Sequence, residues 1–401
     1  MRANHRRLPA VWVMLLALVS LSTLGSVSHA SAQDDLLSGL RQLGGGNSEA
    51  GGLLQAQPLP GAPDGAAAYK VFYVSTGLHG EPITVSGMVI VPPGPVPAEG
   101  RPIVAWAHPT TGVVPRCAPS LARKRFLMIA GLRLMLARGY AVAATDYPGL
   151  GTPETHPYLV GDSEARAVLD SVRVARAIPG VGEGNRFVVW GHSQGGQAAL
   201  FTGMIAESYA PELQLLGVAV AAPATELGPL LKADLDTSGG RNLTAMTLWS
   251  WARIYNAPMD AVLDPVAIPT VDRLAGECIE SIYDVLVRRQ TEKPLAQHFL
   301  SNQNFAAAEP WAGLLKRNTP GALPPRLPVF IAQGTNDQLV LPPVTLAYVQ
   351  MLCRNGSPVV FHPVPGVGHG FVAFKSSDAA VAWMADRFAG QPATSSCGRR
   401  G

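Results

Sequence analysis

The feature that most constrains the fold is a regular alternation of short apolar runs with stretches of helical periodicity. Four of the apolar runs are PIVAWAH, YAVAATDYPG, RFVVWG and LLGVAVAAPA, at residues 102–108, 140–149, 186–191 and 215–224. Helical stretches fill the gaps between them at residues 121–139, 163–178 and 194–209. Strands that are buried on both faces read as continuous apolar runs, and parallel strands need a crossover helix. The alternation therefore predicts an α/β fold with a mostly parallel sheet covered by helices on both faces.

The alternation is preceded by a different pattern and resumes near the end of the chain. Residues 69–76 and 83–93 predict an opening pair of antiparallel strands. Apolar runs at residues 327–334 and 358–364, each followed by a helical stretch, predict two further strands of the same sheet.

A helical block of residues 225–320 interrupts the sheet pattern. It holds amphipathic runs such as LTAMTLWSWARIYN and CIESIYDVLVRR but no run that reads as a strand. We therefore expect a core of residues 69–224 and 321–401, with residues 225–320 inserted in it as a helical cap. A cap on the side where the strands end would lie over the ligand crevice, and the alternative is a separate helical domain elsewhere.

The first residues of the chain predict a secretory signal peptide over residues 1–32. Three arginines precede an apolar run over 8–24, and the pattern Ala30-Ser31-Ala32 predicts cleavage near Ala32. A membrane anchor is the alternative, but the apolar run is short for a span. Residues 33–68 are rich in Gly, Pro, Ala and Gln and predict a flexible N-terminal segment.

Cleavage of the leader changes the charge balance. Removing its three arginines leaves 28 basic residues against 28 acidic ones, so the formal charge of +3 falls to about zero. No basic surplus remains that would favour nucleic acid as a partner.

The stretch VVWGHSQGGQAALF places Ser193 in a Gly-x-Ser-x-Gly pattern between a predicted strand and a predicted helix. This is the context of a nucleophile elbow, in which the serine occupies a sharp turn. Gly191 and Gly195 would permit a close approach of strand and helix. A structural turn is the alternative, and it becomes less favoured if the chain also holds a base and an acid.

A serine nucleophile needs a base, and the base needs an orienting acid, in the chain order Ser, Asp or Glu, His for this type of fold. His369 lies in the glycine-rich loop PGVGHGFV after the last predicted strand, and Asp337 lies in the loop after the strand before it. Both loops are expected at the same sheet edge. The other candidates fit less well, being in the predicted insert, inside a strand or before the serine: His298, His362, Asp146, Asp234, Asp236, Asp260, Asp264 and Asp272.

Acyl transfer also needs hydrogen-bond donors for the oxyanion. One expected donor is the backbone N–H of Gln194, directly after the serine. The second should come from the loop HPTTGV after the run PIVAWA. Pro109 has no N–H, so Thr110 is the first candidate and Thr111 the second. The alternative is that these threonines only shape a turn.

Four cysteines follow the leader: Cys117, Cys278, Cys353 and Cys397. Their even number and the predicted export favour disulfides, for which three pairings are open. No two of the cysteines have the C-x-x-C spacing that is typical of zinc sites, so zinc binding is not indicated.

Five stretches together resemble the secretory-lipase family of α/β-hydrolases, of the Candida antarctica lipase A type. They are AWAHPTTGV, CAPS, YAVAATDYPGLGT, SEARAVLDSVRVAR and VVWGHSQGGQAALF, and the resemblance extends over Tyr69 to Cys397. It implies an α/β-hydrolase fold with an inserted helical cap that acts as lid and acyl tunnel.

The resemblance also implies roles for individual residues. Ser193, Asp337 and His369 match the family's catalytic triad. The family's disulfides imply the pairs Cys117–Cys278 and Cys353–Cys397. The sequence departs from the family at Pro109, where relatives often have glycine, and at the oxyanion threonine, where the yeast enzyme has an acid.

The expected function is secreted carboxylic-ester hydrolysis on acyl esters or triacylglycerols, through an acyl-enzyme at Ser193. It requires no metal or organic cofactor, and the expected partners are an ester or lipid substrate and a lipid interface touched by the cap. The alternatives are an acyltransferase with an alcohol acceptor, a serine peptidase, and a non-catalytic binding protein on the same scaffold. An apolar group in the insert suits fatty acyl chains or else packs the cap's own core: Leu243, Met246, Leu248, Trp249, Trp251, Ile254 and Tyr255.

Overall fold

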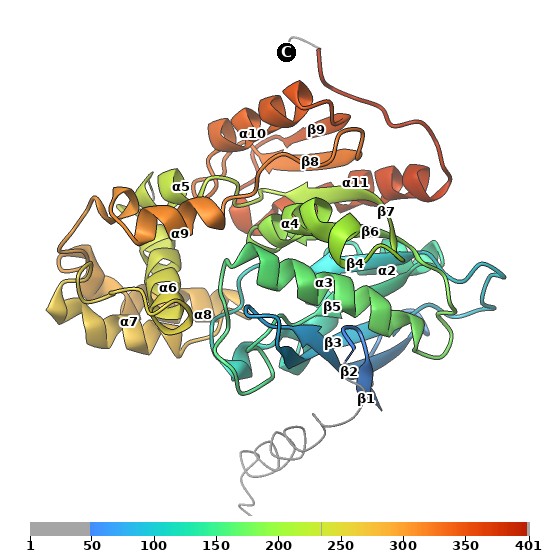
Figure 1. The fold of residues 1–401 in the computed structure, drawn as a ribbon, viewed down its shortest axis with the longest axis horizontal. Helices are drawn as coiled ribbons and strands as arrows, with labels where there is room; N and C mark the ends of the chain where they lie inside the picture. The colour runs from blue at the N-terminus through green and yellow to red at the C-terminus, as the bar shows by residue number, and fades with distance from the viewer. Residues whose placement is uncertain (1–48, 234, 399–401) are drawn as a thin grey trace, which may run out of the picture. The chain divides into compact units, whose positions relative to one another are not determined.

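The computed structural model describes residues 49–233 and 235–398 of the chain. Over these residues the strands form one nine-stranded sheet, in agreement with the predicted alternation. The strand order is β1-β2-β3-β5-β4-β6-β7-β8-β9 (Figure 1). The strands are β1 (Leu53–Pro58), β2 (Ala67–Thr76), β3 (Pro82–Val91), β4 (Ile103–Ala107), β5 (Ala141–Thr145), β6 (Arg186–His192), β7 (Gln214–Ala221), β8 (Val329–Gly334) and β9 (Val359–Val364).

Strand directions follow the two patterns seen in the sequence. Strands β5, β4, β6, β7, β8 and β9 run parallel to one another. Strands β1, β2 and β3 are antiparallel, and β3 joins this ribbon to the parallel part by pairing with β5. The predicted opening pair is confirmed as β2 and β3, with Tyr69 opposite Val89.

Helices cover both faces of the sheet. Along β6, Phe187 and Val189 pack on the side of α3, α4 and α10, whereas Val188 and Trp190 pack on the side of α2 and α11 (Figure 1). These helices are α2 (Leu132–Ala137), α3 (Gly161–Arg176), α4 (Gln194–Tyr209), α10 (Pro342–Arg354) and α11 (Val372–Phe388). Over the described ranges, no helix combines the length and the apolar character that crossing a membrane requires.

The segment between β7 and β8, residues 222–328, is called the insertion below. Its helices are α5 (Leu227–Ala233), α6 (Ser238–Ile254), α7 (Ile268–Ala275), α8 (Ile282–Thr291) and α9 (Trp311–Arg317). Among its described residues the only strand-like pairing is a single bridge between Leu263 and Leu300. All five helices fall inside the range expected for a cap.

The prediction of a flexible segment over residues 33–68 is wrong for its second half. Residues 53–58 form strand β1, which pairs with β2, and backbone bonds also join Gly51 and Gly52 to Val74. Main-chain pairing along an open sheet edge needs no apolar side chains, so composition did not reveal it. Residues 33–48 and the predicted signal peptide over 1–32 lie outside the described residues.

The helix expected over residues 121–139 is interrupted. Gly131 has a φ of 79°, and only the six residues after it form α2. A Cβ at Gly131 would lie 3.1 Å from Cβ of Ser377, which belongs to α11. Gly131, in its left-handed conformation, therefore separates α2 from the residues before it, and its lack of a side chain lets α11 pack closely.

Candidate active site

Ser193 stands at the junction of β6 and α4, in a strained backbone conformation. Its φ and ψ are 57° and −116°, outside the region that residues with a side chain normally occupy. Such strain persists only where the surrounding structure holds it, and it is concentrated at functional positions. The turn presents the hydroxyl beside the N-terminus of α4, where backbone N–H groups favour negative charge.

The glycines around Ser193 are required by close backbone contacts. A Cβ at Gly191 would lie 2.0 Å from the carbonyl oxygen of Gly195, and one at Gly195 would lie 1.9 Å from the carbonyl oxygen of Ala107. Carbon and oxygen cannot approach so closely. Strand β6, helix α4 and the end of β4 therefore meet in this arrangement only when both positions are glycine.

His369 connects Ser193 to Asp337 through hydrogen bonds on both ring nitrogens. Its Nδ1 lies 2.8 Å from Oδ2 of Asp337, and its Nε2 lies 2.8 Å from Oγ of Ser193. Because an ionised carboxylate only accepts, Nδ1 carries the ring proton and Nε2 is free to accept the serine proton. The chain thus has the geometry in which a base can activate a hydroxyl.

The carboxylate of Asp337 is buried and held at both oxygens. Oδ1 accepts the backbone N–H groups of Leu339 and Val340, both at 2.9 Å, and Oδ2 also accepts Nε2 of Gln333 at 3.2 Å. Burial by itself would raise the pKa of Asp337, but His369 and the two N–H groups hold that pKa below its usual value. The carboxylate is therefore ionised and fixed in orientation at neutral pH.

The two loops that carry the acid and the base lie side by side, as expected from the sequence. Thr335 N–H donates to the carbonyl of Val364, and Asn336 N–H donates to the carbonyl of Val367. These bonds link the loop after β8 to the loop after β9, which continues into His369.

The competing acids and bases form contacts that do not involve Ser193. Asp146 accepts hydrogen bonds from Ser86 on β3 and from Ser120 in the loop after β4, and so joins these two segments. His298 contacts Asp264 within the insertion, and the ring of His362 stacks on Phe330. Asp234 lies outside the described residues.

The predicted oxyanion loop contacts the insertion. The hydroxyl of Thr110 is 2.9 Å from the hydroxyl of Tyr158, and the carbonyl of Thr111 accepts the N–H of Ile279 at 2.8 Å. The hydroxyl of Thr111 is buried without a partner among the described residues, whereas Thr110 is only half-buried. Gln194 opens helix α4, which places its N–H in the first turn beside Ser193.

Sequence reasoning missed His192, the residue before the serine. Its Nε2 donates to the backbone carbonyl of His369 at 3.0 Å, and the two rings are 5.1 Å apart. Burial, together with an electrostatic contribution from His369, lowers the pKa of His192 to about 3, so this ring is neutral at physiological pH. The Gly-His-Ser pattern showed a histidine in the motif but not the direction of its ring.

Sequence reasoning also missed a buried polar group behind Gln194. The side chain of Gln194 contacts Glu164 from α3 and His156 from the loop after β5. In the sequence, Glu164 is one of several charged residues of the helix expected over residues 163–178. Only the packing of α3 against α4 shows that the side chain of Glu164 is buried and points toward Gln194.

Both disulfides implied by the family resemblance are present. Cys117 is bonded to Cys278, which ties the loop after β4 to the insertion, and Cys353 is bonded to Cys397. Within the described ranges, no three His, Cys, Asp or Glu side chains lie together as a metal site.

The apolar group on α6 divides between the interior of the insertion and its surroundings. Met246, Leu248 and Trp251 are fully buried, and Trp251 stacks on Trp311 of α9. The other members are partly buried: Leu243, Trp249, Ile254 and Tyr255. At least part of the group thus packs the insertion's own core.

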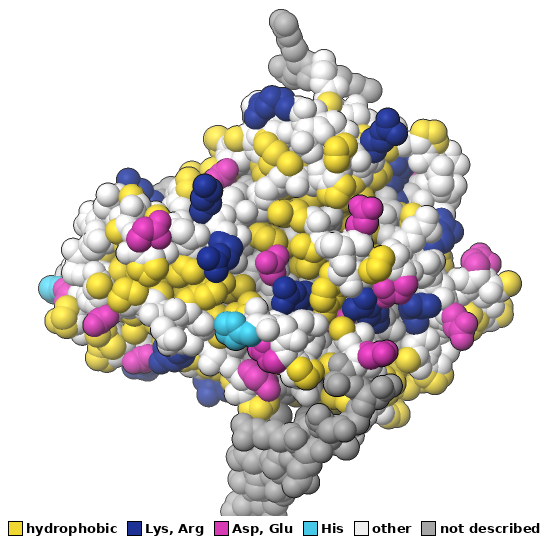
Figure 2. Space-filling view, viewed as in Figure 1, with side chains coloured by type: hydrophobic (Ala, Val, Ile, Leu, Met, Phe, Trp, Pro, Cys, Tyr) yellow, Lys and Arg dark blue, Asp and Glu magenta, His cyan; other side chains and the backbone are white. Residues whose placement is uncertain are grey.

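Apolar side chains are also exposed on the insertion. Figure 2 shows hydrophobic side chains gathered over the region of the insertion helices. On α8, Tyr283, Leu286 and Val287 are exposed, and they are spaced as neighbours on one helix face.

Comparison with known proteins agrees on one family. The family model described as secretory lipase matches residues 124–396. A probable inactive lipase of Mycobacterium tuberculosis is 25% identical over 360 residues, which are 83% of this chain and 76% of that protein. Lipase 5 of Candida albicans is 27% identical over 382 residues, 88% of this chain and 80% of that protein.

Among solved structures, Candida antarctica lipase A in its closed state resembles the chain with a TM-score of 0.73. The sequences are 18% identical, and the match covers 87% of this chain and 85% of that one. At this identity the likeness shows the fold alone, and it is the α/β-hydrolase fold expected from the sequence.

Proposed function

The chain belongs to the secretory lipase family, and from this premise we propose that it hydrolyses carboxylic esters through an acyl-enzyme on Ser193. The observation that carries the proposal is the hydrogen-bonded series Ser193–His369–Asp337 on a strained strand-to-helix turn. A serine in a merely structural turn has no need of a base at 2.8 Å or of an oriented acid behind that base.

In the proposed mechanism, Nε2 of His369 takes the hydroxyl proton of Ser193 while Oγ attacks the ester carbonyl carbon. The carbonyl oxygen becomes an oxyanion and accepts hydrogen bonds from Gln194 N–H and Thr110. Thr110 can use its hydroxyl when Tyr158 donates to it, since its own proton is then free. The alcohol leaves with the proton from Nε2. Water then attacks the acyl-enzyme and gives a proton to Nε2, and Oγ of Ser193 leaves with that proton as the acid is released.

Asp337 has two roles in this sequence of steps. It keeps the ring proton of His369 on Nδ1, and its charge stabilises the imidazolium that forms when Nε2 accepts a proton. The two backbone N–H bonds on Oδ1 support this role, because they fix which oxygen faces the ring.

A relative that is named as inactive makes activity an explicit question for this chain. The M. tuberculosis protein shares 25% identity with it. Here the nucleophile, base and acid are all present and are joined by hydrogen bonds, which supports an active enzyme.

We further propose that the insertion is a cap over the site and that the enzyme acts outside the cytoplasm. The Ile279–Thr111 hydrogen bond and the Cys117–Cys278 disulfide support the cap, because both join the insertion to the loop after β4, in which the predicted oxyanion loop lies. Disulfides and the leader pattern support export. The exposed apolar face of α8 is the surface through which the cap would touch a lipid interface.

The decisive experiment is labelling with a fluorophosphonate probe, which reacts with activated serines. Wild type should be labelled, and Ser193→Ala should lose labelling and lower ester turnover by several orders of magnitude. Ser208→Ala is the matched control, because Ser208 lies on the same helix with its hydroxyl bonded only to the carbonyl of Ile205. Equal labelling of the Ser193→Ala variant would overturn the proposal.

Acyl-chain length distinguishes a lipase from an esterase. Because the insertion offers partly buried apolar residues on α6, we expect p-nitrophenyl esters of medium and long acyl chains to be cleaved as well as short ones. Activity confined to acetate and butyrate would assign the insertion's apolar residues to packing. Formation of a new ester when an alcohol is added would instead indicate an acyltransferase.

A further inference from the structure

Glu164 is a fully buried carboxyl group without a cationic partner. It lies in the first turn of α3, and its exposed fraction is 0%. Oε1 accepts the N–H of Leu159 at 3.0 Å and Nε2 of Gln194 at 2.7 Å, while Oε2 is buried without a partner. None of the ion pairs formed by the described residues includes Glu164.

The side chain of Gln194 is held by two acceptors. One amide hydrogen goes to Glu164 and the other goes to Nε2 of His156 at 3.1 Å. Nδ1 of His156 donates to the carbonyl of Pro148 at 2.8 Å, so Nε2 is the lone-pair nitrogen of a neutral ring. Burial lowers the pKa of His156 to about 3, which agrees with that neutral state.

Neighbouring titratable groups are uncharged as well. The loop after β5 contributes Tyr147, His156 and Tyr158, and burial raises the pKa of both tyrosines above the usual value. Helix α4 contributes the neutral Gln194. Arg288 of the insertion acts electrostatically on Tyr158, but Glu164 has no such cation. A negative charge on Glu164 would therefore be buried with two hydrogen bonds to Oε1 but without a compensating cation.

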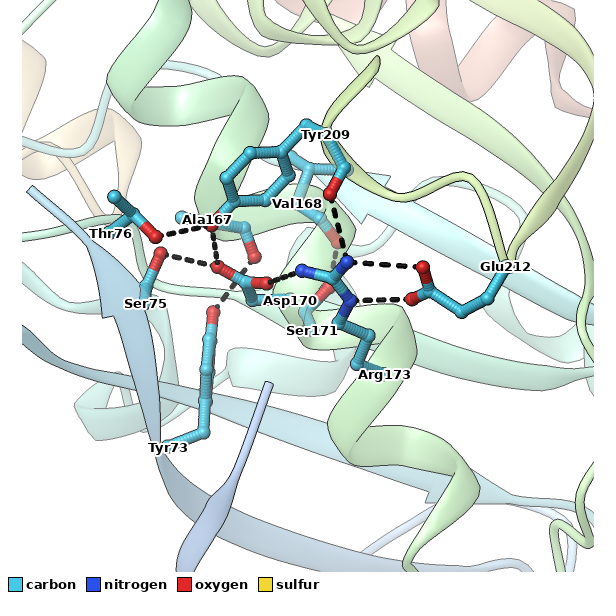
Figure 3. Close-up of polar contacts among 10 residues, drawn as sticks. All are labelled: Tyr73, Ser75, Thr76, Ala167, Val168, Asp170, Ser171, Arg173, Tyr209 and Glu212. Atoms are coloured by element: carbon cyan, nitrogen blue, oxygen red, sulfur yellow. Dashed lines mark hydrogen bonds and ion pairs between the residues drawn. The ribbon is translucent and has the colours of Figure 1, made fainter. Parts of the chain in front are cut away.

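A second buried carboxyl on the same helix, Asp170, differs by having a cationic partner. Burial raises its pKa too, but hydrogen bonds from Ser75, Arg173 and Tyr209 and the charge of Arg173 oppose that rise. Asp170 accepts bonds from Ser75 and Tyr209 and forms an ion pair with Arg173 at 2.8 Å (Figure 3). Arg173 in turn bonds to Glu212. Both oxygens of Asp170 are thus satisfied, and a cation balances its charge, whereas Glu164 has neither property.

We propose that Glu164 is a positioning residue that works in its protonated, uncharged form. It holds the side chain of Gln194, whose backbone N–H is the proposed oxyanion donor, and it keeps the region behind the oxyanion free of negative charge. Ionisation of Glu164 in the alkaline range then lowers activity. The inference rests on the proposed ester hydrolysis.

Burial raises the pKa of Glu164 from 4.5 to about 8. The folded state therefore keeps a proton that the unfolded chain releases above about 4.5, so the stability from this group is full below that pH. It is lost progressively as the pH rises and is gone at about 8. The same ionisation would set an alkaline limb in the rate.

The test compares pH profiles of kcat/KM for a soluble p-nitrophenyl ester, corrected for spontaneous hydrolysis. Wild type should lose about tenfold per pH unit above the Glu164 pKa. Glu164→Gln keeps an oxygen that accepts from Leu159 and Gln194 but does not titrate, so it should retain activity at neutral pH and lack this limb. Asp170→Asn is the control and should leave the limb where it is.

Two results would overturn the inference. One is an alkaline limb that is unchanged in Glu164→Gln, and the other is loss of most activity in that variant at neutral pH. If Glu164→Gln does not fold, infrared spectra of Ser193→Ala decide: a protonated-carboxyl C=O band should be present at neutral pH and disappear above the Glu164 pKa. Absence of that band would contradict the inference.

The infrared measurement needs no catalysis, so it separates this inference from the proposed function. Failure of wild type to hydrolyse esters or react with the fluorophosphonate would defeat the proposed function alone. A missing carboxyl band in an enzyme that labels normally would defeat the role of Glu164 alone.

Discussion

Replacing Asp337 by Asn tests the orientation of the proposed catalytic base, His369, most directly. Oδ1 of Asp337 accepts two backbone N–H groups, from Leu339 and Val340. An asparagine must turn its carbonyl oxygen to these donors, so its NH2 group takes the place of Oδ2 and faces Nδ1 of His369. Nδ1 then has to accept, and the ring proton moves to Nε2, the nitrogen that should take the serine proton.

The expected magnitude follows from this exchange of tautomers. A base with its proton on the wrong nitrogen loses about 10⁴-fold in kcat, which is about 5.5 kcal/mol of transition-state stabilisation. Folding stability should change much less, because the two backbone bonds remain. The bond from Gln333 is lost, which costs about 1 kcal/mol.

The assay is the rate of fluorophosphonate labelling and of ester hydrolysis, together with Tm. Asp146→Asn is the matched control, since Asp146 is also buried but accepts two of its bonds from the hydroxyls of Ser86 and Ser120. Those hydroxyls can turn and accept from an amide. Activity within tenfold of wild type for Asp337→Asn, or an equal loss for Asp146→Asn, would refute the reasoning.

Three further predictions concern the surroundings of the site. His192→Phe removes the donor to the His369 carbonyl, so kcat should fall roughly ten- to a hundredfold with KM unchanged; a change confined to KM would contradict this role. Gly195→Ala should leave little folded protein in a soluble-expression assay, because its Cβ would lie 1.9 Å from a carbonyl oxygen of β4. Replacing Cys117 and Cys278 by Ser opens a loop with a sequence separation of 161, and chemical denaturation should show a loss of about 5 kcal/mol on the chain-entropy estimate. An unchanged unfolding midpoint would show that this disulfide does not restrain the unfolded chain.

Much of the fold could be predicted because apolar runs and turn residues determine secondary structure within short segments of the chain. The runs that became β4, β5, β6 and β7 are continuous apolar segments, as parallel buried strands require. The edge strand β1 was missed because its residues carry no apolar alternation, and its pairing depends on the open edge of β2. The helix expected over residues 121–139 is interrupted at Gly131, which has a left-handed conformation and packs against α11.

The sequence by itself determined the chemical groups that the site can contain. Gly-x-Ser-x-Gly between a strand and a helix, followed by an Asp and a His in two later loops, identifies the candidates because each role needs a particular residue type in a particular local context. Tertiary structure alone decided the protonation and direction of the groups around them. From the sequence, three polar residues could equally face water: His192, His156 and Glu164. Their pKa shifts come from burial among segments far apart in the chain. Desolvation and hydrogen bonding depend on which segments meet, and one-dimensional spacing does not contain that information.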